Sequence, residues 1–156
     1  MKFTKALLCL CSLGITGAAS SQAASGAEKK AQAMTSIRVK IGEKSFTARL
    51  EDNETARAFT AMLPLKLEMR DLNDNEKVIE LPKRLPGEVT SPGTIREGDL
   101  MIWSSRSLVL FYKTFSSSYS YFRLGRIEDT SGLVQAVGDG SVMVTFTKAP
   151  PSSADR

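Results

Sequence analysis

Aromatic rings and hydroxyl groups gather between residues 111 and 121 of this 156-residue sequence. Aromatic faces beside serine and tyrosine hydroxyls suit a ligand that is partly apolar and partly hydrogen-bonding, such as a peptide or a small metabolite. The alternative is that alternate residues belong to the core, and we expect Phe111 to be one of these. Tyr119 and Tyr121 share one face of a strand, so we expect both or neither to line a groove. The members of the cluster are Phe111, Tyr112, Phe115, Ser116, Ser117, Ser118, Tyr119 and Tyr121.

The composition excludes several kinds of catalytic chemistry. The sequence contains no histidine, and its two cysteines are Cys9 and Cys11. Histidine acid–base catalysis, Ser-His and Cys-His nucleophile pairs and histidine-ligated metals are therefore ruled out. The sequence has no glycine-rich phosphate loop, no G-x-S-x-G motif and no metal cluster, which argues against hydrolases and oxidoreductases, and we expect no cofactor. The acidic turn over 71–76 lacks the glycine and the distal glutamate of a calcium loop, so we expect no metal site there.

The N-terminal residues have the pattern of a cleavable export signal. Two lysines among the first five residues precede an apolar run from Ala6 to Ala18. This run is shorter than the roughly 20 residues that span a bilayer. Small residues at Ser21 and Ala23 predict cleavage after the latter, which gives a signal peptide over 1–23. We expect a periplasmic or secreted protein without a membrane partner after cleavage; the alternative is a membrane anchor or a buried helix.

Cleavage after Ala23 changes both the thiol content and the charge of the chain. Both cysteines leave with the signal, so the remaining chain cannot form a disulfide. Each follows a leucine where lipid attachment favours small residues, and we therefore expect no lipidation. The basic count falls from 21 to 19 against 17 acidic residues, which leaves a net charge of +2. With so little excess positive charge, we expect no nucleic-acid partner.

Small and polar residues flank a single folded region. We predict a flexible linker over 24–35, one domain over 36–147 and a disordered tail over 148–156. Within the domain, polar and apolar residues alternate with the period of β-strands. Strands are predicted over 37–41, 46–50, 65–69, 77–81, 99–103, 108–113, 119–127 and 142–147.

Two of these strands differ from the rest. The strands over 99–103 and 108–113 are apolar at nearly every position, which indicates burial on both faces. We expect Trp103 to be a core residue rather than a residue at a rim. Closing this many strands into a barrel would remove the exposed edges that promote aggregation.

Two short helices and a long loop complete the predicted domain. The first helix begins at the cap Asp52-Asn53 and ends at Pro64. The second is capped by Thr130 or Ser131 and ends at Gly138. Its inward-facing residues are predicted to be Leu133, Val134 and Val137. The segment over 82–93 has three prolines and two glycines, which is typical of a loop.

Three short motifs, in their order along the chain, resemble those of the cyclophilin fold, in particular its divergent bacterial cyclophilin-like branch. Thr55-Ala56-Arg57-Ala58-Phe59 is similar to the T-A-x-N-F opening of the first cyclophilin helix, with alanine in place of the asparagine. Gly98-Asp99-Leu100 resembles the G-x-L before a central strand, and Leu124-Gly125-Arg126-Ile127 resembles F-G-x-V. The spans 71–77 and 108–127 are also similar to the bacterial branch. The resemblance implies a mainly β fold, a closed eight-stranded barrel capped by two short helices, with a surface groove for Xaa-Pro peptides.

The family's pattern for prolyl isomerisation is not preserved. The F-H-R-x-I…Q-G-G stretch, which supplies the catalytic arginine, has no counterpart between Leu63 and Gly98. The family's active-site histidine falls on Tyr121. The resemblance therefore implies a non-catalytic module that binds a proline-containing peptide or a small ligand, with no catalytic residue assigned. The candidate groove residues are Phe115, Tyr119, Tyr121 and Arg123.

Two other functions stay open from the sequence. Prolyl isomerisation moves no proton and crosses a barrier of about 18–20 kcal/mol, which falls when the amide nitrogen accepts a hydrogen bond. An arginine beside an apolar pocket could donate that hydrogen bond. The alternative function is therefore a divergent peptidyl-prolyl isomerase or folding helper for exported proteins. Its candidate catalytic residue is Arg123. The third reading is a purely structural or interaction protein, which predicts no ligand-sized cavity.

Overall fold

The computed structural model describes residues 34–150. The predicted signal peptide over 1–23, its cleavage site and both cysteines lie outside the described residues, as do most of the predicted linker and tail. Within 34–150, none of the helices has the length and hydropathy that a membrane span requires.

Eleven strands and two helices make up this region. The strands are β1 (Ser36–Ile41), β2 (Lys44–Leu50), β3 (Leu65–Leu72), β4 (Glu76–Glu80), β5 (Val89–Thr90), β6 (Gly93–Ile95), β7 (Asp99–Trp103), β8 (Ser107–Phe111), β9 (Phe115–Ser117), β10 (Tyr121–Ile127) and β11 (Val142–Lys148). The helices are α1 (Glu54–Thr60) and α2 (Leu133–Val137).

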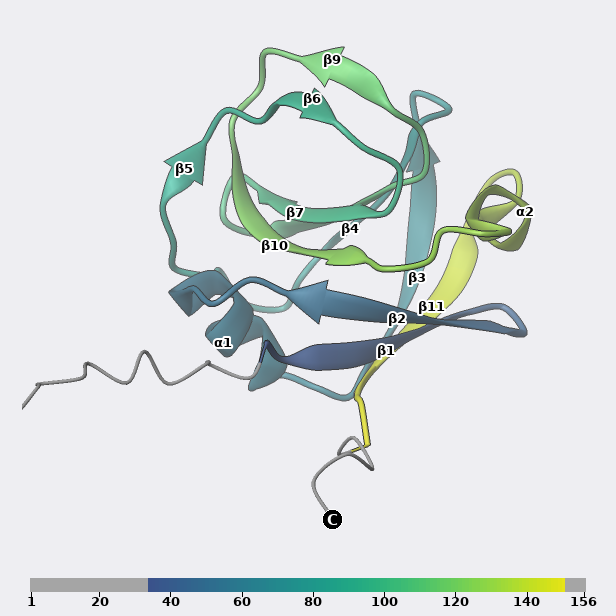
Figure 1. Ribbon diagram of the computed structural model, residues 1–156, viewed down its shortest axis with the longest axis horizontal. Helices are drawn as coiled ribbons and strands as arrows, with labels where there is room; N and C mark the ends of the chain where they lie inside the picture. The colour runs from purple at the N-terminus through teal and green to yellow at the C-terminus, as the bar shows by residue number, and fades with distance from the viewer. Residues whose placement is uncertain (1–33, 151–156) are drawn as a thin grey trace, which may run out of the picture. The chain divides into compact units, whose positions relative to one another are not determined.

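The main sheet closes into a barrel of antiparallel strands (Figure 1). The order around the barrel is β2, β1, β11, β3, β4, β8, β7 and β10, and β10 pairs with β2 to close it. Strand β5 extends the sheet along β10, and β6 pairs with β9 in a separate two-stranded sheet. The prediction of a mainly β fold with a closed eight-stranded barrel and two short helices is confirmed.

Three local predictions need correction. Helix α2 follows Gly132 without a side-chain cap, whereas a cap at Thr130 or Ser131 was expected. Val134 is 44% exposed although it was predicted to face inward. A five-residue helix buries one stripe, and the i, i+4 spacing gives that stripe to Leu133 and Val137. The predicted loop over 82–93 contains the short strand β5.

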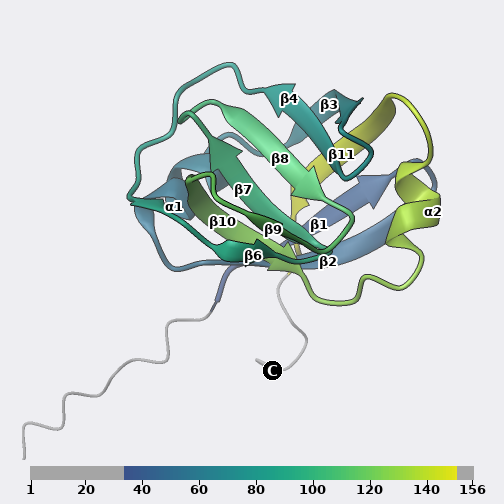
Figure 2. The same ribbon diagram turned by 90° about the horizontal axis from the view of Figure 1, so that it is seen from above.

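The barrel interior is filled by the inward-facing residues of its strands. The two helices lie at opposite ends of the barrel (Figure 2), and each buries apolar side chains in the interior core. Phe59 of α1 is fully buried and meets Phe146 of β11 edge-to-face, with ring centroids 5.6 Å apart. Burial of such rings is the main source of stability in a domain of this size.

A second apolar cluster lies on the outer face of the barrel. Leu108 and Leu110 of β8 belong to the interior core, whereas Val109 and Phe111 belong to this second cluster. The prediction that this strand is buried on both faces is therefore confirmed, as is burial of Phe111. The sheet formed by β6 and β9 covers the cluster with Ile95 and Phe115. The buried members are Val78, Ile95, Met101, Val109, Phe111 and Tyr121.

A buried lysine connects the β3–β4 turn to the α2–β11 connection. Lys77 is fully buried, and its Nζ lies 2.6 Å from Asp71 Oδ2. The same Nζ donates to the carbonyl oxygens of Gly138 (2.8 Å) and Gly140 (2.6 Å). The Tyr112 hydroxyl donates to Asp71 Oδ2 at 2.7 Å. Burial raises the pKa of Asp71, but the hydrogen bonds from Lys77 and Tyr112 outweigh it and hold that pKa below its usual value.

Candidate functional site

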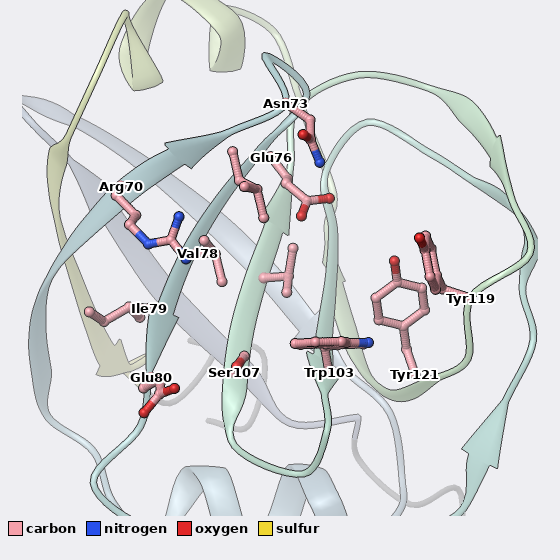
Figure 3. Close-up of a pocket in the computed structure, with 12 residues that line it drawn as sticks. Arg70, Asn73, Glu76, Val78, Ile79, Glu80, Trp103, Ser107, Tyr119 and Tyr121 are labelled. Atoms are coloured by element: carbon pink, nitrogen blue, oxygen red, sulfur yellow. The ribbon is translucent and has the colours of Figure 1, made fainter.

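A cavity of about 530 Å³ opens on the outer face of the barrel, beside the second apolar cluster. Figure 3 shows its lining, which comes from β3, β4, β7, β8, β10 and the segment before β10. Most lining residues occupy alternate strand positions, because alternate side chains point outward. A cavity of this size is typical of small-molecule sites. The lining residues are Arg70, Leu72, Asn73, Glu76, Val78, Ile79, Glu80, Trp103, Ser107, Val109, Tyr119 and Tyr121.

Three aromatic side chains form one end of this cavity. Trp103 is 50% exposed, Tyr119 is 67% exposed and Tyr121 is 7% exposed. The prediction that Trp103 belongs to the core is wrong. Trp103 is the last residue of β7 and lies opposite the small Ser107 of β8, and its side chain borders the cavity instead of entering either apolar cluster. Tyr119 and Tyr121 both line the cavity, although Tyr119 precedes β10 and is not part of the strand.

Charged side chains lie among the apolar lining residues. Glu76 begins β4, and Arg70 of β3 is registered opposite Val78 of β4. Burial raises the pKa of Glu76, and the negative charge of Asp71 raises it further. Across residues 34–150, no carboxylate lies within 4.0 Å of the Arg70 guanidinium nitrogens. Neither residue was a candidate groove residue from the sequence. Alternation placed Arg70 on an outward face without showing that this part of the face is hollow, and Glu76 was considered only in the acidic turn over 71–76.

Arg123 lies away from this cavity. It borders a polar crevice of about 340 Å³ with Asn53, Glu54, Arg57, Glu88 and Thr90. Its Nε is 3.7 Å from Glu51 Oε1, and its carbonyl oxygen accepts from Asn53 Nδ2 at 2.8 Å.

Phe115 also lies outside the cavity lining. Its ring packs against Phe111 in the second cluster, with centroids 5.7 Å apart. Of the four candidate groove residues, the structure thus brings Tyr119 and Tyr121 together and places Phe115 and Arg123 elsewhere. In the described part of the chain, no group of three or more histidine, cysteine, aspartate or glutamate side chains is arranged to hold a metal ion.

Comparison with known proteins identifies the family. A family model described as the cyclophilin-like family matches residues 39–147. The chain belongs to the cyclophilin-like family. It is also similar to the solution structure of a hypothetical protein from Archaeoglobus fulgidus, with 20% identity over 74% of this chain and 95% of that chain, at a TM-score of 0.46. No curated protein matches the chain.

The motifs that carry the cyclophilin-like resemblance have structural roles in this chain. Thr55 is buried, and its hydroxyl donates to the Pro86 carbonyl at 2.7 Å, which attaches the loop over 82–93 to α1. Gly125 lies where β10 meets β2, and a Cβ there would be 2.4 Å from the Arg49 carbonyl oxygen. None of the residues of the three short motifs lines the cavity, whereas the similar spans over 71–77 and 108–127 contribute six of its lining residues. Family membership fixes the scaffold and leaves the ligand open.

Proposed function

We propose that this protein is an exported, non-catalytic binding module that holds a small ligand or a short peptide in the outer cavity. The observation that supports this function is the aromatic end of a ligand-sized cavity, formed by Trp103, Tyr119 and Tyr121 on a rigid barrel. A purely structural protein has no use for such a cavity. The export component rests on the signal pattern over 1–23 of the sequence.

The cavity suits a ligand with both apolar and polar parts. Val78 and Val109 provide an apolar surface, while Asn73 and Ser107 offer hydrogen-bonding groups around it. The backbone that carries these side chains belongs mostly to barrel strands, so the site is largely formed before a ligand arrives. Preorganisation of this kind lowers the entropic cost of binding.

Trp103 provides a direct test, because it is the only tryptophan of the chain and borders the cavity. A panel of Xaa-Pro peptides and amphipathic small molecules would be titrated while Trp103 fluorescence is recorded. We expect at least one member to cause a saturable change that Tyr119→Leu weakens. Arg123→Gln, outside the cavity, should leave the affinity unchanged. If no panel member perturbs Trp103, and native mass spectrometry finds no copurifying ligand, the proposal is overturned.

One observation favours a second candidate, a divergent prolyl isomerase. Arg70 lies in the same cavity as Tyr121, which occupies the position of the family's active-site histidine, so a guanidinium donor is available beside apolar residues. Two-dimensional exchange NMR on Ala-Pro, Leu-Pro and Phe-Pro peptides separates the two functions, because uncatalysed exchange takes tens to hundreds of seconds. Catalysis that is lost in Arg70→Gln and kept in Arg123→Gln would establish the isomerase. An absence of exchange would favour the binding module.

A further inference from the structure

We propose that the ligand of the outer cavity carries an alkylated ammonium group, which contacts the rings of Trp103, Tyr119 and Tyr121 and pairs with the carboxylate of Glu76. This inference rests on the proposed binding function and specifies the chemical class of the ligand. Both a free quaternary amine and a methylated lysine side chain present this group.

The three rings come from separate segments and meet at one end of the cavity. Figure 3 shows Tyr119 and Tyr121 next to each other, with Trp103 beside them and its ring plane turned differently. Tyr121 is held in place because its ring packs edge-to-face on Phe111, at 5.7 Å between centroids. Trp103 and Tyr119 are at least half exposed, so their faces are accessible to a ligand. Ring faces carry negative electrostatic potential and attract cations, most strongly at tryptophan.

Aromatic rings alone would also accept a neutral apolar ligand. The acidic residue Glu76 is what favours a cationic ligand over a neutral one. Glu76 lies on the side of the tyrosine rings. The register pairs Glu76 with Phe111, on which the Tyr121 ring packs, whereas Trp103 is level with Ser107 and Glu80. In Figure 3 the Glu76 carboxylate extends to the side of the Tyr121 hydroxyl. The pKa of the Tyr121 hydroxyl is raised, mainly by burial, and a hydrogen bond with Ser117 opposes this shift. The negative charge of Glu76 is close enough to raise the same pKa further. Within residues 34–150, no lysine or arginine nitrogen lies within 4.0 Å of the Glu76 carboxylate. A ligand cation would supply the missing partner.

Arg70 does not fill this role. The strand register places Arg70 opposite Val78, whereas Glu76 is opposite Leu72. In Figure 3 the arginine lies on the other side of Val78 from the aromatic end. Glu80 adds a second carboxylate to the lining, with Arg106 Nε 3.8 Å away. Arg106 therefore offsets the charge of Glu80, and Glu76 is the lining carboxylate with no cationic nitrogen of residues 34–150 within 4.0 Å.

Alkylation of the ammonium follows from the surfaces around it. A primary ammonium has three N–H donors that need acceptors, whereas the ring faces and the valine side chains offer none. A quaternary ammonium has no N–H donor and is weakly hydrated for a cation. It therefore gives up little hydration when it enters a cavity with aromatic walls.

The test compares choline with its neutral isostere 3,3-dimethylbutan-1-ol, in which carbon replaces the charged nitrogen. Both are titrated into the purified protein while Trp103 fluorescence and amide NMR shifts are recorded. We expect choline to bind about tenfold more tightly than the isostere, and Glu76→Gln to reduce that preference to the part that the aromatic rings supply. Tyr119→Leu should weaken choline binding by about twofold to fivefold, the range for one cation–π contact at an exposed site.

A matched variant controls for long-range charge. Glu68→Gln removes a carboxylate from the exposed side of the same β3 strand that carries Arg70, at a residue that does not line the cavity. Its affinity for choline should stay within twofold of the original protein. A peptide with trimethyllysine is titrated in parallel, and whichever of choline and peptide binds more tightly identifies the source of the ammonium group.

The outcomes separate this inference from the binding function. If the isostere binds as tightly as choline, or if Glu76→Gln leaves the preference intact, the ammonium inference is overturned and the cavity remains a binding site. If neither choline nor the trimethyllysine peptide perturbs Trp103 while other panel ligands do, the ammonium inference also fails. If no ligand of any class binds, the binding function itself fails. The comparison of two ligands on the unaltered protein does not depend on any variant folding.

Discussion

Replacement of Lys77 by methionine should be among the most destabilising substitutions in this domain. Removing one partner of a buried ion pair costs about 3–5 kcal/mol, because the remaining charge loses its counter-ion. Here the remaining charge is Asp71, whose side chain is 19% exposed and still accepts hydrogen bonds from the Tyr112 hydroxyl and the Asp74 amide. We therefore expect a loss at the lower end of the range, about 3 kcal/mol in the free energy of unfolding.

Two further variants show whether this cost arises from the lysine charge. Tyr112→Phe removes one hydrogen bond to a carboxylate and should cost about 1.5 kcal/mol. The double variant Lys77→Met with Asp71→Asn should be about 1–2 kcal/mol more stable than Lys77→Met alone, because no uncompensated carboxylate remains. Urea unfolding at pH 7 measures all three. A Lys77→Met loss no greater than that of Tyr112→Phe would refute the reasoning.

The same network predicts a dependence on pH. The pKa of Asp71 is held below its usual value, so its stabilising contribution is present at neutral pH. It declines as the pH falls below about 4 and through the lowered pKa. Lys77→Met removes the largest favourable partner, and the unfolding free energy of this variant should change less between pH 6 and pH 3. An equally steep acid dependence in the variant would contradict this assignment.

Three other predictions test the barrel and the cavity. Gly125→Ala should destabilise the domain by about 2–4 kcal/mol in urea unfolding, because a Cβ would lie 2.4 Å from the Arg49 carbonyl oxygen. A loss below about 0.5 kcal/mol would show that β10 and β2 can separate to make room for the methyl group without strain. Phe111→Ala should lower the free energy of unfolding by about 3–5 kcal/mol and also weaken ligand binding, because the Phe111 ring supports Tyr121. Phe59→Ala, in the barrel interior, should cost as much stability but leave ligand binding unchanged at temperatures where both variants are folded. Choline affinity should increase as the pH rises through the pKa of Glu76, which burial and the charge of Asp71 raise and whose titratable neighbour in the cavity is Tyr121. A flat profile between pH 4 and pH 7, or a pH dependence that persists in Glu76→Gln, would contradict the assignment.

Much of the barrel could be predicted from local patterns. Alternation of apolar and polar residues defines β1 and β2 almost to the residue, because each strand buries one face and its side chains alternate with period two. The near-continuous apolar character of β8 predicted burial on both faces, and all five of its residues are buried. The capping asparagine also located α1, since the Asn53 side chain accepts from the Ala56 amide.

The cavity could not be predicted in this way. Alternation identifies Arg70 as outward-facing at most, and the outer face of a barrel is mostly exposed to solvent. Glu76 falls in the predicted turn, and the apolar run over 99–103 predicted Trp103 in the core. Whether one part of it is hollow depends on the pairing of strands that are distant in sequence, such as β4 with β8, which places Glu80 opposite Ser107. Arg123 is the candidate from the sequence because the aromatic residues Tyr121 and Phe122 flank it on the predicted groove-side strand. The pairing of β5 ends at Phe122, and the side chain of Arg123 borders the crevice beside α1.

The sequence by itself therefore determined the strands, the helix positions and the family scaffold, because these follow from local periodicity, caps and close-packed motif residues. The tertiary structure decided which outward-facing residues share a site. Glu76 and Trp103 are distant in sequence from each other and from the pair Tyr119 and Tyr121, and the strand order brings all four into one cavity lining. Non-local packing of that kind leaves no periodic signal in the residues that it assembles.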